Sequence, residues 1–184
     1  MVEPYRHTPL RDDRSIRVLH LLPSRDLSTT LHCKMKVVPL DNAPKYEALS
    51  YAWDSETPDR DIVCGNKPIR ITANCAAALR RLRRCSKARV LWIDAVCISQ
   101  GDERELNQQV RMMGDIYKNA HQVVVWLGEG DSDSDLAFKY FNKISRHFTR
   151  RFIPLFVAER LSERALRQAK SIAEGEQSVL YGFC

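Results

Sequence analysis

Alternating apolar and polar residues predict β-strands in the first half of the chain. Apolar positions from 31 to 37 alternate with His32, Lys34 and Lys36, which is typical of a strand with one buried face and one wet face. The apolar runs 62–64 and 69–71 flank Gly65-Asn66-Lys67-Pro68 and predict a β-hairpin. Other strands are expected at 16–22, 46–54, 89–94 and 122–128.

Segments with the apolar spacing of helices lie between and after the later strands. Either Thr72 or Asn74 can cap a helix that ends near Cys85, and its apolar stripe leaves four arginines pointing away from the core: Arg80, Arg81, Arg83 and Arg84. A second helix, over 102–119, carries apolar side chains at helical spacing: Leu106, Val110, Met113 and Tyr117. Two more helices are expected, one with apolar positions from 136 to 148 and one over 157–173.

This order of elements predicts an α/β fold. Strands alternate with helices from residue 46 onward, which favours a mostly parallel sheet flanked by helices, with the early hairpins added at its edge. Ligands of such sheets bind beyond the carboxyl ends of the strands. Three such ends, at 50–53, 94–100 and 128–129, are therefore expected to meet.

Length and composition indicate one globular domain, or one domain with an appendage. The 184 residues are 44% hydrophobic and 28% charged. We expect a flexible lead-in over 1–15, a domain over 16–150 and a helical extension over 151–184. The apolar tail of that extension indicates the front part of a longer protein.

Charge and cysteine content narrow the class of protein. The formal net charge is +6, but clustered arginines more often form a solvated face than a nucleic-acid site, so nucleic acid is not expected as a partner. The six cysteines lack C-x-x-C spacing, which argues against a zinc ribbon and a disulfide framework. No leader and no apolar run of about 18 residues is present, so we expect a cytoplasmic protein without a membrane span.

Two stretches resemble the motifs of the fungal heterokaryon-incompatibility (HET) domain. They are Tyr46–Trp53 (YEALSYAW) and Leu91–Gln100 (LWIDAVCISQ). Further matches follow in the family's order and spacing, up to residue 128: Glu105, Gln109-Val110, Met113, Ile116-Tyr117, Ala120 and Val125-Trp126-Leu127-Gly128. Asp54 departs from the pattern, because the family usually has glycine there.

The resemblance implies a fold and a function. HET domains are remotely similar to TIR domains, so it implies a flavodoxin-like α/β fold. They trigger cell death when incompatible fungal strains fuse, usually as the amino-terminal part of a longer regulated protein. Some TIR domains cleave NAD between nicotinamide and ribose, whereas others only assemble. Two hypotheses follow: an NAD glycohydrolase, or a non-enzymatic self-association module, each with regulatory domains or partner proteins beyond residue 184.

NAD cleavage would need a carboxylate near the ribose. Nicotinamide leaves as a neutral amine, and neither a metal nor a prosthetic group is required, since NAD is the substrate. Glu105 matches the family's glutamate four residues before the glutamine of the QV pair, although a glutamate there also caps a helix. Glu129 is the rival candidate. The resemblance to TIR enzymes implies this, because aligning the strand order places their catalytic glutamate after the strand that corresponds to Val123–Gly128. The choice between the two stays open.

Six further residues are expected to contact the ligand or shape its site: Ser50, Tyr51, Trp53, Asp94, Cys97 and Gln100. Tyr51 and Trp53 can stack on a nicotinamide or adenine ring. Asp94 ends an apolar strand, so it either orients the loop or meets the ligand. Cys97 has no histidine near it in sequence and is more consistent with a buried structural thiol than with a nucleophile.

Overall fold

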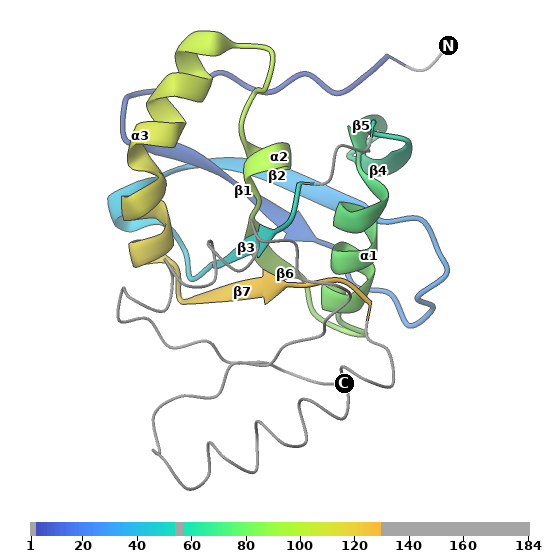
Figure 1. Ribbon diagram of the computed structural model, residues 1–184. Coiled ribbons are helices and arrows are strands. Elements are labelled where there is room, and N and C mark those ends of the chain that lie inside the picture. The colour runs from blue at the N-terminus through green and yellow to red at the C-terminus, as the bar shows by residue number, and fades with distance from the viewer. Residues whose placement is uncertain (1–2, 54–56, 130–184) are drawn as a thin grey trace, which may run out of the picture.

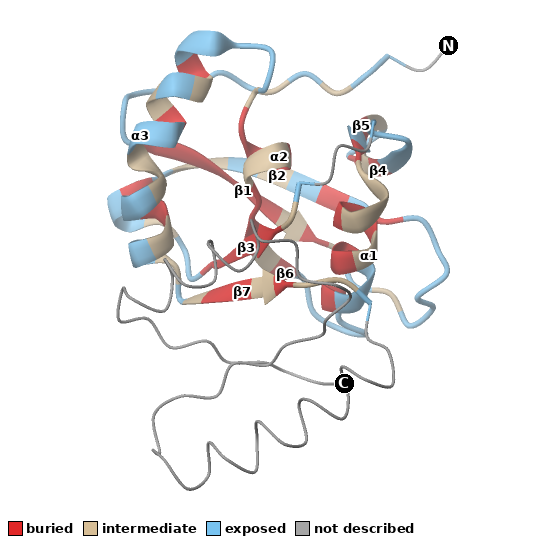
Figure 2. Cartoon of the chain, viewed as in Figure 1, coloured by how far each residue is buried: buried red, intermediate tan, exposed pale blue. Residues whose placement is uncertain are grey.

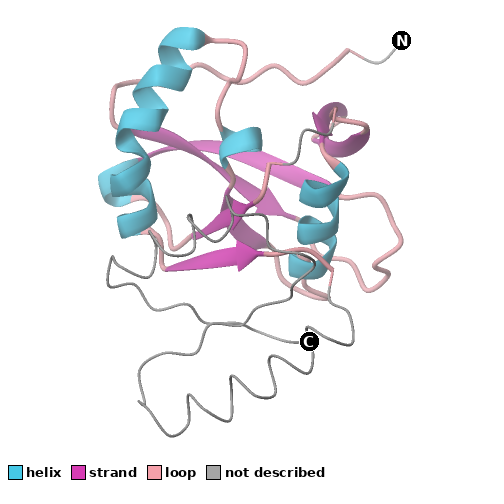
Figure 3. Ribbon diagram, viewed as in Figure 1, coloured by secondary structure: helices cyan, strands magenta, loops and turns pink. Residues whose placement is uncertain are grey.

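A seven-stranded mixed sheet with helices on both sides forms the described part of the chain (Figures 1 and 3). The computed structural model describes residues 3–53 and 57–129. The strands lie side by side in the order β5 (Lys67–Ile71), β4 (Arg60–Cys64), β2 (His32–Pro39), β1 (Ser15–Leu21), β6 (Arg89–Trp92), β3 (Glu47–Tyr51) and β7 (Gln122–Trp126).

The predicted α/β class is confirmed, but the sheet is mixed rather than mostly parallel. Strands β6, β3 and β7 are parallel to one another, whereas β1 is antiparallel to both of its neighbours. A central antiparallel strand is absent from the all-parallel sheet of a flavodoxin-like fold. The TIR-like fold is therefore not confirmed.

The first hairpin was expected at the edge of the sheet, and that prediction is wrong. Strand β1 lies in the middle, between β2 and β6. The reason is its composition: six of the seven positions in Ser15–Leu21 are buried, so both faces must be covered. The β4–β5 hairpin does lie at the edge, and Gly65 turns it with a φ of 63°.

Two long helices cover opposite sides of the sheet (Figure 1). They are α1 (Ala73–Leu82) and α3 (Glu103–Asn119); a single helical turn, α2 (Asp94–Cys97), follows β6, and a 3₁₀ turn, η1 (Leu40–Asn42), follows β2. Of the two predicted caps of α1, Thr72 is the one used, since its hydroxyl accepts the N–H of Cys75. Figure 2 shows that the buried residues of both helices lie toward the sheet.

The predicted apolar stripe of α1 is confirmed, with one correction among the arginines. Arg80, Arg81 and Arg84 are exposed, whereas Arg83 is buried. Its guanidinium donates to backbone carbonyls of the 24–30 loop, at 2.9 Å to Asp26 and 3.1 Å to Thr30. Arg83 therefore ties that loop to the end of α1.

The apolar spacing of α3 does not mark its most buried face. Val110 is 52% exposed, whereas the residues buried on this helix are Glu105, Gln109 and Ile116. The two polar side chains on that face have hydrogen-bond partners, as buried polar groups require. Gln109 donates to the carbonyl of Ser15, and Glu105 pairs with a buried arginine.

The segment before β1 is bonded to the rest of the chain. The N–H of Tyr5 donates to the carbonyl of Pro68 at 3.0 Å, and the carbonyl of Thr8 accepts from Arg17. Asp54 and the helices expected over 136–148 and 157–173 lie outside the described residues. No helix in the described part of the chain combines the length and apolar composition that a membrane span requires.

The central position of β1 predicts a large loss of stability on truncation of Leu19. This side chain is fully buried, so Leu19→Ala should lower the free energy of unfolding by about 2–5 kcal/mol. Leu27→Ala is the matched control, because Leu27 is 54% exposed. Denaturant unfolding of both variants measures the difference. Equal, small losses would contradict the central placement of β1.

Candidate functional site

Three parallel strands end at the same edge of the sheet, as predicted. Residues 47–51 of β3 pair in register with residues 122–126 of β7, and Glu47 and Ala48 pair with Leu91 and Trp92 of β6. We call the residues that gather at this edge the strand-end site: Ser50, Tyr51, Trp53, Asn74, Asp94, Tyr117 and Trp126. The described β3, β6 and β7 end there together because all three run in the same direction.

Asp94 is the carboxylate of the strand-end site. It opens α2 directly after β6, and one carboxylate oxygen accepts the N–H of Ala95 at 2.7 Å and the indole N–H of Trp53 at 3.3 Å. Burial raises the pKa of Asp94, and the two hydrogen bonds offset this only in part. The Trp53 ring that reaches it is 51% exposed, so its surface is available to a ligand.

Two tyrosine hydroxyl groups lie within the electrostatic reach of this carboxylate. The phenol of Tyr51 lies close to the side chains of Thr72 and Cys75, and that of Tyr117 lies close to Ser50. Burial, followed by smaller electrostatic effects that include the charge of Asp94, raises the pKa of both phenols. The two tyrosines are therefore neutral hydrogen-bonding groups at ordinary pH.

Asn74 is a member of this site that the sequence did not reveal as one. Its amide donates to the carbonyl of Ala52 at 3.0 Å, and its side-chain oxygen accepts the indole N–H of Trp126 at 2.8 Å. It thus connects the ends of β3 and β7 to the first turn of α1. The only signal in the sequence is its place near the start of α1, which makes it a candidate capping residue.

Glu105 forms a buried ion pair with Arg17. The guanidinium bonds both carboxylate oxygens, at 2.5 Å and 2.8 Å, and the N–H of Ser99 adds a third bond at 2.7 Å. Burial alone would raise the pKa of Glu105, but the hydrogen bonds from Arg17 and Ser99 and the charge of Arg17 hold that pKa below its ordinary value. The backbone of Glu105 is capped by Asp102.

Arg17 was also not identified from the sequence. It is 1% exposed and donates five hydrogen bonds, which reach Thr8, Cys97 and Glu105. A charged side chain inside a buried apolar strand requires hydrogen-bonding partners. The presence of an arginine in the β1 sequence SIRVLHL was therefore the signal that could have identified it.

Glu129 lies just past β7, at the same edge as Asp94. It is exposed and follows Gly128, whose φ of 112° is a conformation that favours glycine. The structure therefore places Glu129 in an exposed position just past the end of β7 and Glu105 in a buried ion pair, and the choice between them remains a prediction.

Cys97 and Gln100 support the backbone around Asp94. Burial raises the pKa of the Cys97 thiol to about 12, and its sulfur accepts the N–H of Ile93 at 3.4 Å. Gln100 donates to the carbonyl of Asp94 at 2.9 Å. His7, distant in sequence, reaches α2 through the carbonyl of Val96 at 2.8 Å. Within residues 3–53 and 57–129, no three His, Cys, Asp or Glu side chains gather to hold a metal ion.

Comparison with known proteins places this site within a matched region. The family model described as "Heterokaryon incompatibility protein (HET)" matches residues 46–176. The chain is similar to "Heterokaryon incompatibility protein 6, OR allele" of Neurospora crassa, with 37% identity over 146 residues that cover 72% of this chain and 22% of the relative. It thus spans about a fifth of that relative's length. No solved structure matches the chain.

The buried ion pair predicts a stability that depends on pH. Because the pKa of Glu105 is lower in the folded state than in the unfolded state, its ionisation stabilises the fold above the unfolded pKa of about 4.3, and this contribution is lost as pH falls through the folded pKa. Glu105→Gln should therefore lower the free energy of unfolding near pH 7 by about 3 kcal/mol and flatten its decline at acid pH.

Unfolding measured from pH 3 to 7 checks this prediction. Glu103→Gln is the control, since Glu103 is an exposed carboxylate in the same helical turn. If both variants lost stability with the same pH profile as the parent chain, the Arg17–Glu105 pair would not be the source.

Proposed function

The chain belongs to the heterokaryon-incompatibility (HET) family, and we propose that it is a cell-death effector that cleaves NAD between nicotinamide and ribose. The family match confirms the resemblance found in residues 46–128. The name of the Neurospora crassa relative supports a role in incompatibility between fungal strains. Because the chain covers a small part of that relative, the activity and partners of the whole protein belong to the proposal.

The observation that supports NAD cleavage is the half-buried Asp94 carboxylate beside the exposed Trp53 ring. In this reaction the C–N bond between ribose and nicotinamide breaks, nicotinamide leaves as a neutral amine, and water adds to the ribose carbon and releases a proton. The ribose becomes positively charged on the way, and a carboxylate in a partly dehydrated site stabilises that charge strongly. Trp53 would stack on a ring of the dinucleotide.

In this proposal Glu105 is a positioning residue rather than the catalytic carboxylate, because both of its oxygens already accept hydrogen bonds. Three hydrogen bonds from Arg17 and Ser99 occupy Glu105, so it would position the loop that follows α2. Asp94 would lie beside the ribose, and exposed Glu129 would be the second carboxylate of the edge. Ser50 and Tyr51 would bind substrate hydroxyls, while Cys97 and Gln100 would hold the backbone of Asp94.

The exposed indole of Trp53 also supports the second hypothesis, a self-association module without catalysis. A large apolar ring with half of its surface in water can be buried against a second copy of the chain. The two functions differ in one measurable product, free nicotinamide. They are compatible if association assembles the active site.

Asp94→Asn should reduce nicotinamide release by about 10²–10³-fold, because it removes the charge that stabilises the ribose cation while keeping the side chain's size. The chain is incubated with NAD at several protein concentrations and after artificial clustering. Asp13→Asn, an exposed carboxylate in the turn before β1, is the control. Glu129→Gln tests the rival.

Each outcome of this assay assigns a role. Loss of activity in Glu129→Gln with full activity in Asp94→Asn would exchange the two carboxylates. Absence of nicotinamide from the parent chain at every concentration would leave self-association as the function.

The raised pKa of Asp94 predicts an acid limb in the pH profile of NAD cleavage. Activity needs the ionised carboxylate, so kcat/KM should fall as pH drops through this raised pKa. Trp53→Phe keeps a ring but removes the N–H that lowers the pKa, so the limb should move to higher pH. An unmoved limb in Trp53→Phe would show that another group controls it; Leu27→Ala is the control for an exposed apolar change.

A further inference from the structure

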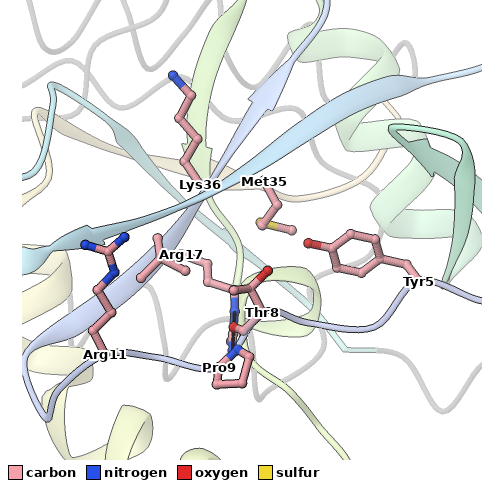
Figure 4. A pocket seen from close by; sticks show the side chains of 8 residues that line it. Tyr5, Thr8, Pro9, Arg11, Arg17, Met35 and Lys36 are labelled. Carbon is pink, nitrogen blue, oxygen red and sulfur yellow. Dashed lines mark hydrogen bonds between the residues drawn. The ribbon is translucent and has the colours of Figure 1, made fainter.

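A cavity separate from the strand-end site opens between the N-terminal segment and two central strands (Figure 4). Its volume is about 290 Å³, which is near the lower limit for sites that hold small organic molecules. The segment before β1 contributes Tyr5, Thr8, Pro9 and Arg11 to its wall, and β1 and β2 supply the rest. The cavity shares no lining residue with the strand-end site, so a molecule bound in it would be distinct from the proposed substrate.

Positive charge in this wall has no acidic counterpart. Three cationic residues, Arg11, Arg17 and Lys36, line the cavity, and no aspartate or glutamate is among its lining residues. Arg17 already donates all five of its N–H groups within the chain. Lys36 points to the other face of β2 (Figure 4), because neighbouring residues of a strand alternate and Val37 is the residue opposite Arg17. Arg11 is therefore the cation that faces a ligand.

The Arg11 guanidinium has no partner among the residues that the structure describes. The acidic residue next to it in sequence, Asp12, accepts the N–H of Arg14 and the hydroxyl of Ser15, both at 3.0 Å. Arg11 itself is exposed and lies outside the helices and strands. Its charge is thus available at the mouth of a cavity that contains no carboxylate.

The arrangement of the wall fits a molecule with one charged end. Figure 4 shows the Arg11 guanidinium on one side of the cavity and the Tyr5 hydroxyl on the other, with Met35 between them. Burial raises the pKa of Tyr5, so its phenol stays protonated and uncharged. Met35 and Val37 lie two residues apart on β2, so their apolar side chains share the face that lines the cavity.

We propose that this cavity binds a small organic anion, with its phosphate or carboxylate group on Arg11 and its apolar body against Met35 and Val37. A guanidinium suits both head groups, because it can donate two parallel N–H bonds to a pair of oxygens. The apolar side chains bind the body of the molecule by removing its surface from water.

Such a ligand would fasten the N-terminal segment to the sheet. It would bridge Arg11 of the segment and β2, in addition to the bonds that the segment already makes. Those bonds join Arg17 to the carbonyl of Thr8, at 2.9 Å and 2.6 Å, and His7 to the carbonyl of Val96 in α2, at 2.8 Å. Because the ligand binds only the chain in which segment and sheet are together, it should raise the Tm.

Direct binding of three probes to the whole 184-residue chain tests the proposal. Phenyl phosphate and benzoate carry the two head groups on the same ring, and benzyl alcohol is the neutral control. In ligand-observed NMR at neutral pH, at least one anion should bind with a Kd of about 1 mM or tighter, and benzyl alcohol about tenfold more weakly. At ten times its Kd, that anion should raise the Tm by roughly 2–4 °C. The tighter anion identifies the head group.

Variants separate this site from general attraction to a basic protein. Arg11→Gln should weaken anion binding by about tenfold or more, because it removes the charged donor. Arg25→Gln removes the same charge from an exposed arginine of the 24–30 loop and should leave binding unchanged. Val37→Phe keeps every charge and fills the cavity with a side chain suited to a strand, so it should abolish binding while the circular dichroism stays parental.

Three results would overturn the proposal. The first is that neither anion binds at about 10 mM. The second is that benzyl alcohol binds as tightly as the anions. The third is that Arg11→Gln binds them with the parental affinity, or loses no more affinity than Arg25→Gln.

Discussion

The buried guanidinium of Arg17 is the group on which the arrangement around the strand-end site depends. A charge placed in the central strand of a sheet is tolerated only when every donor has a partner, and Arg17 uses all five of its N–H groups. Its partners come from the N-terminal segment, from α2 and from α3. One side chain thereby joins four parts of the chain that no local sequence signal connects.

The position of Asp94 follows from this network. Arg17 holds the last carbonyl of α2 at Cys97, and Glu105 holds the N–H of Ser99, so the start of the loop between α2 and α3 is fixed by two bonds. Asp94 opens the same single turn of helix. At the other end of β6, its first residue, Arg89, pairs with the buried Glu47 of β3, so an ion pair lies near each end of this short strand. The two pairs restrict how β6 can slide or tilt, and with it the carboxylate that follows.

Local patterns predicted most elements correctly but not their neighbours. Alternation in β2, the Gly65 turn and the stripe of α1 all depend on residues close in sequence, and these were recognised. The central place of β1 depends on pairing with β6, some seventy residues away, and a hairpin signal does not contain that information. Arg83 was expected outside because helical spacing says nothing of a loop that offers carbonyls to it. The candidate site was predicted as a meeting of strand ends, yet Asn74 and Tyr117 enter it from helices. Asn74 belongs to no motif, and Tyr117 was recognised as a family match and an apolar helix position but not as a site residue.

The same physical argument separates the two acidic residues of the central motif region. A carboxylate whose oxygens already accept bonds from a guanidinium and a backbone N–H, as in Glu105, is stabilised in one charge state and gains little from a new partner. Asp94 accepts its two bonds on one oxygen, in a site where burial opposes its charge. A cation that develops beside it would relieve that opposition. Glu105 is therefore suited to holding the loop, and Asp94 to stabilising positive charge in a ligand.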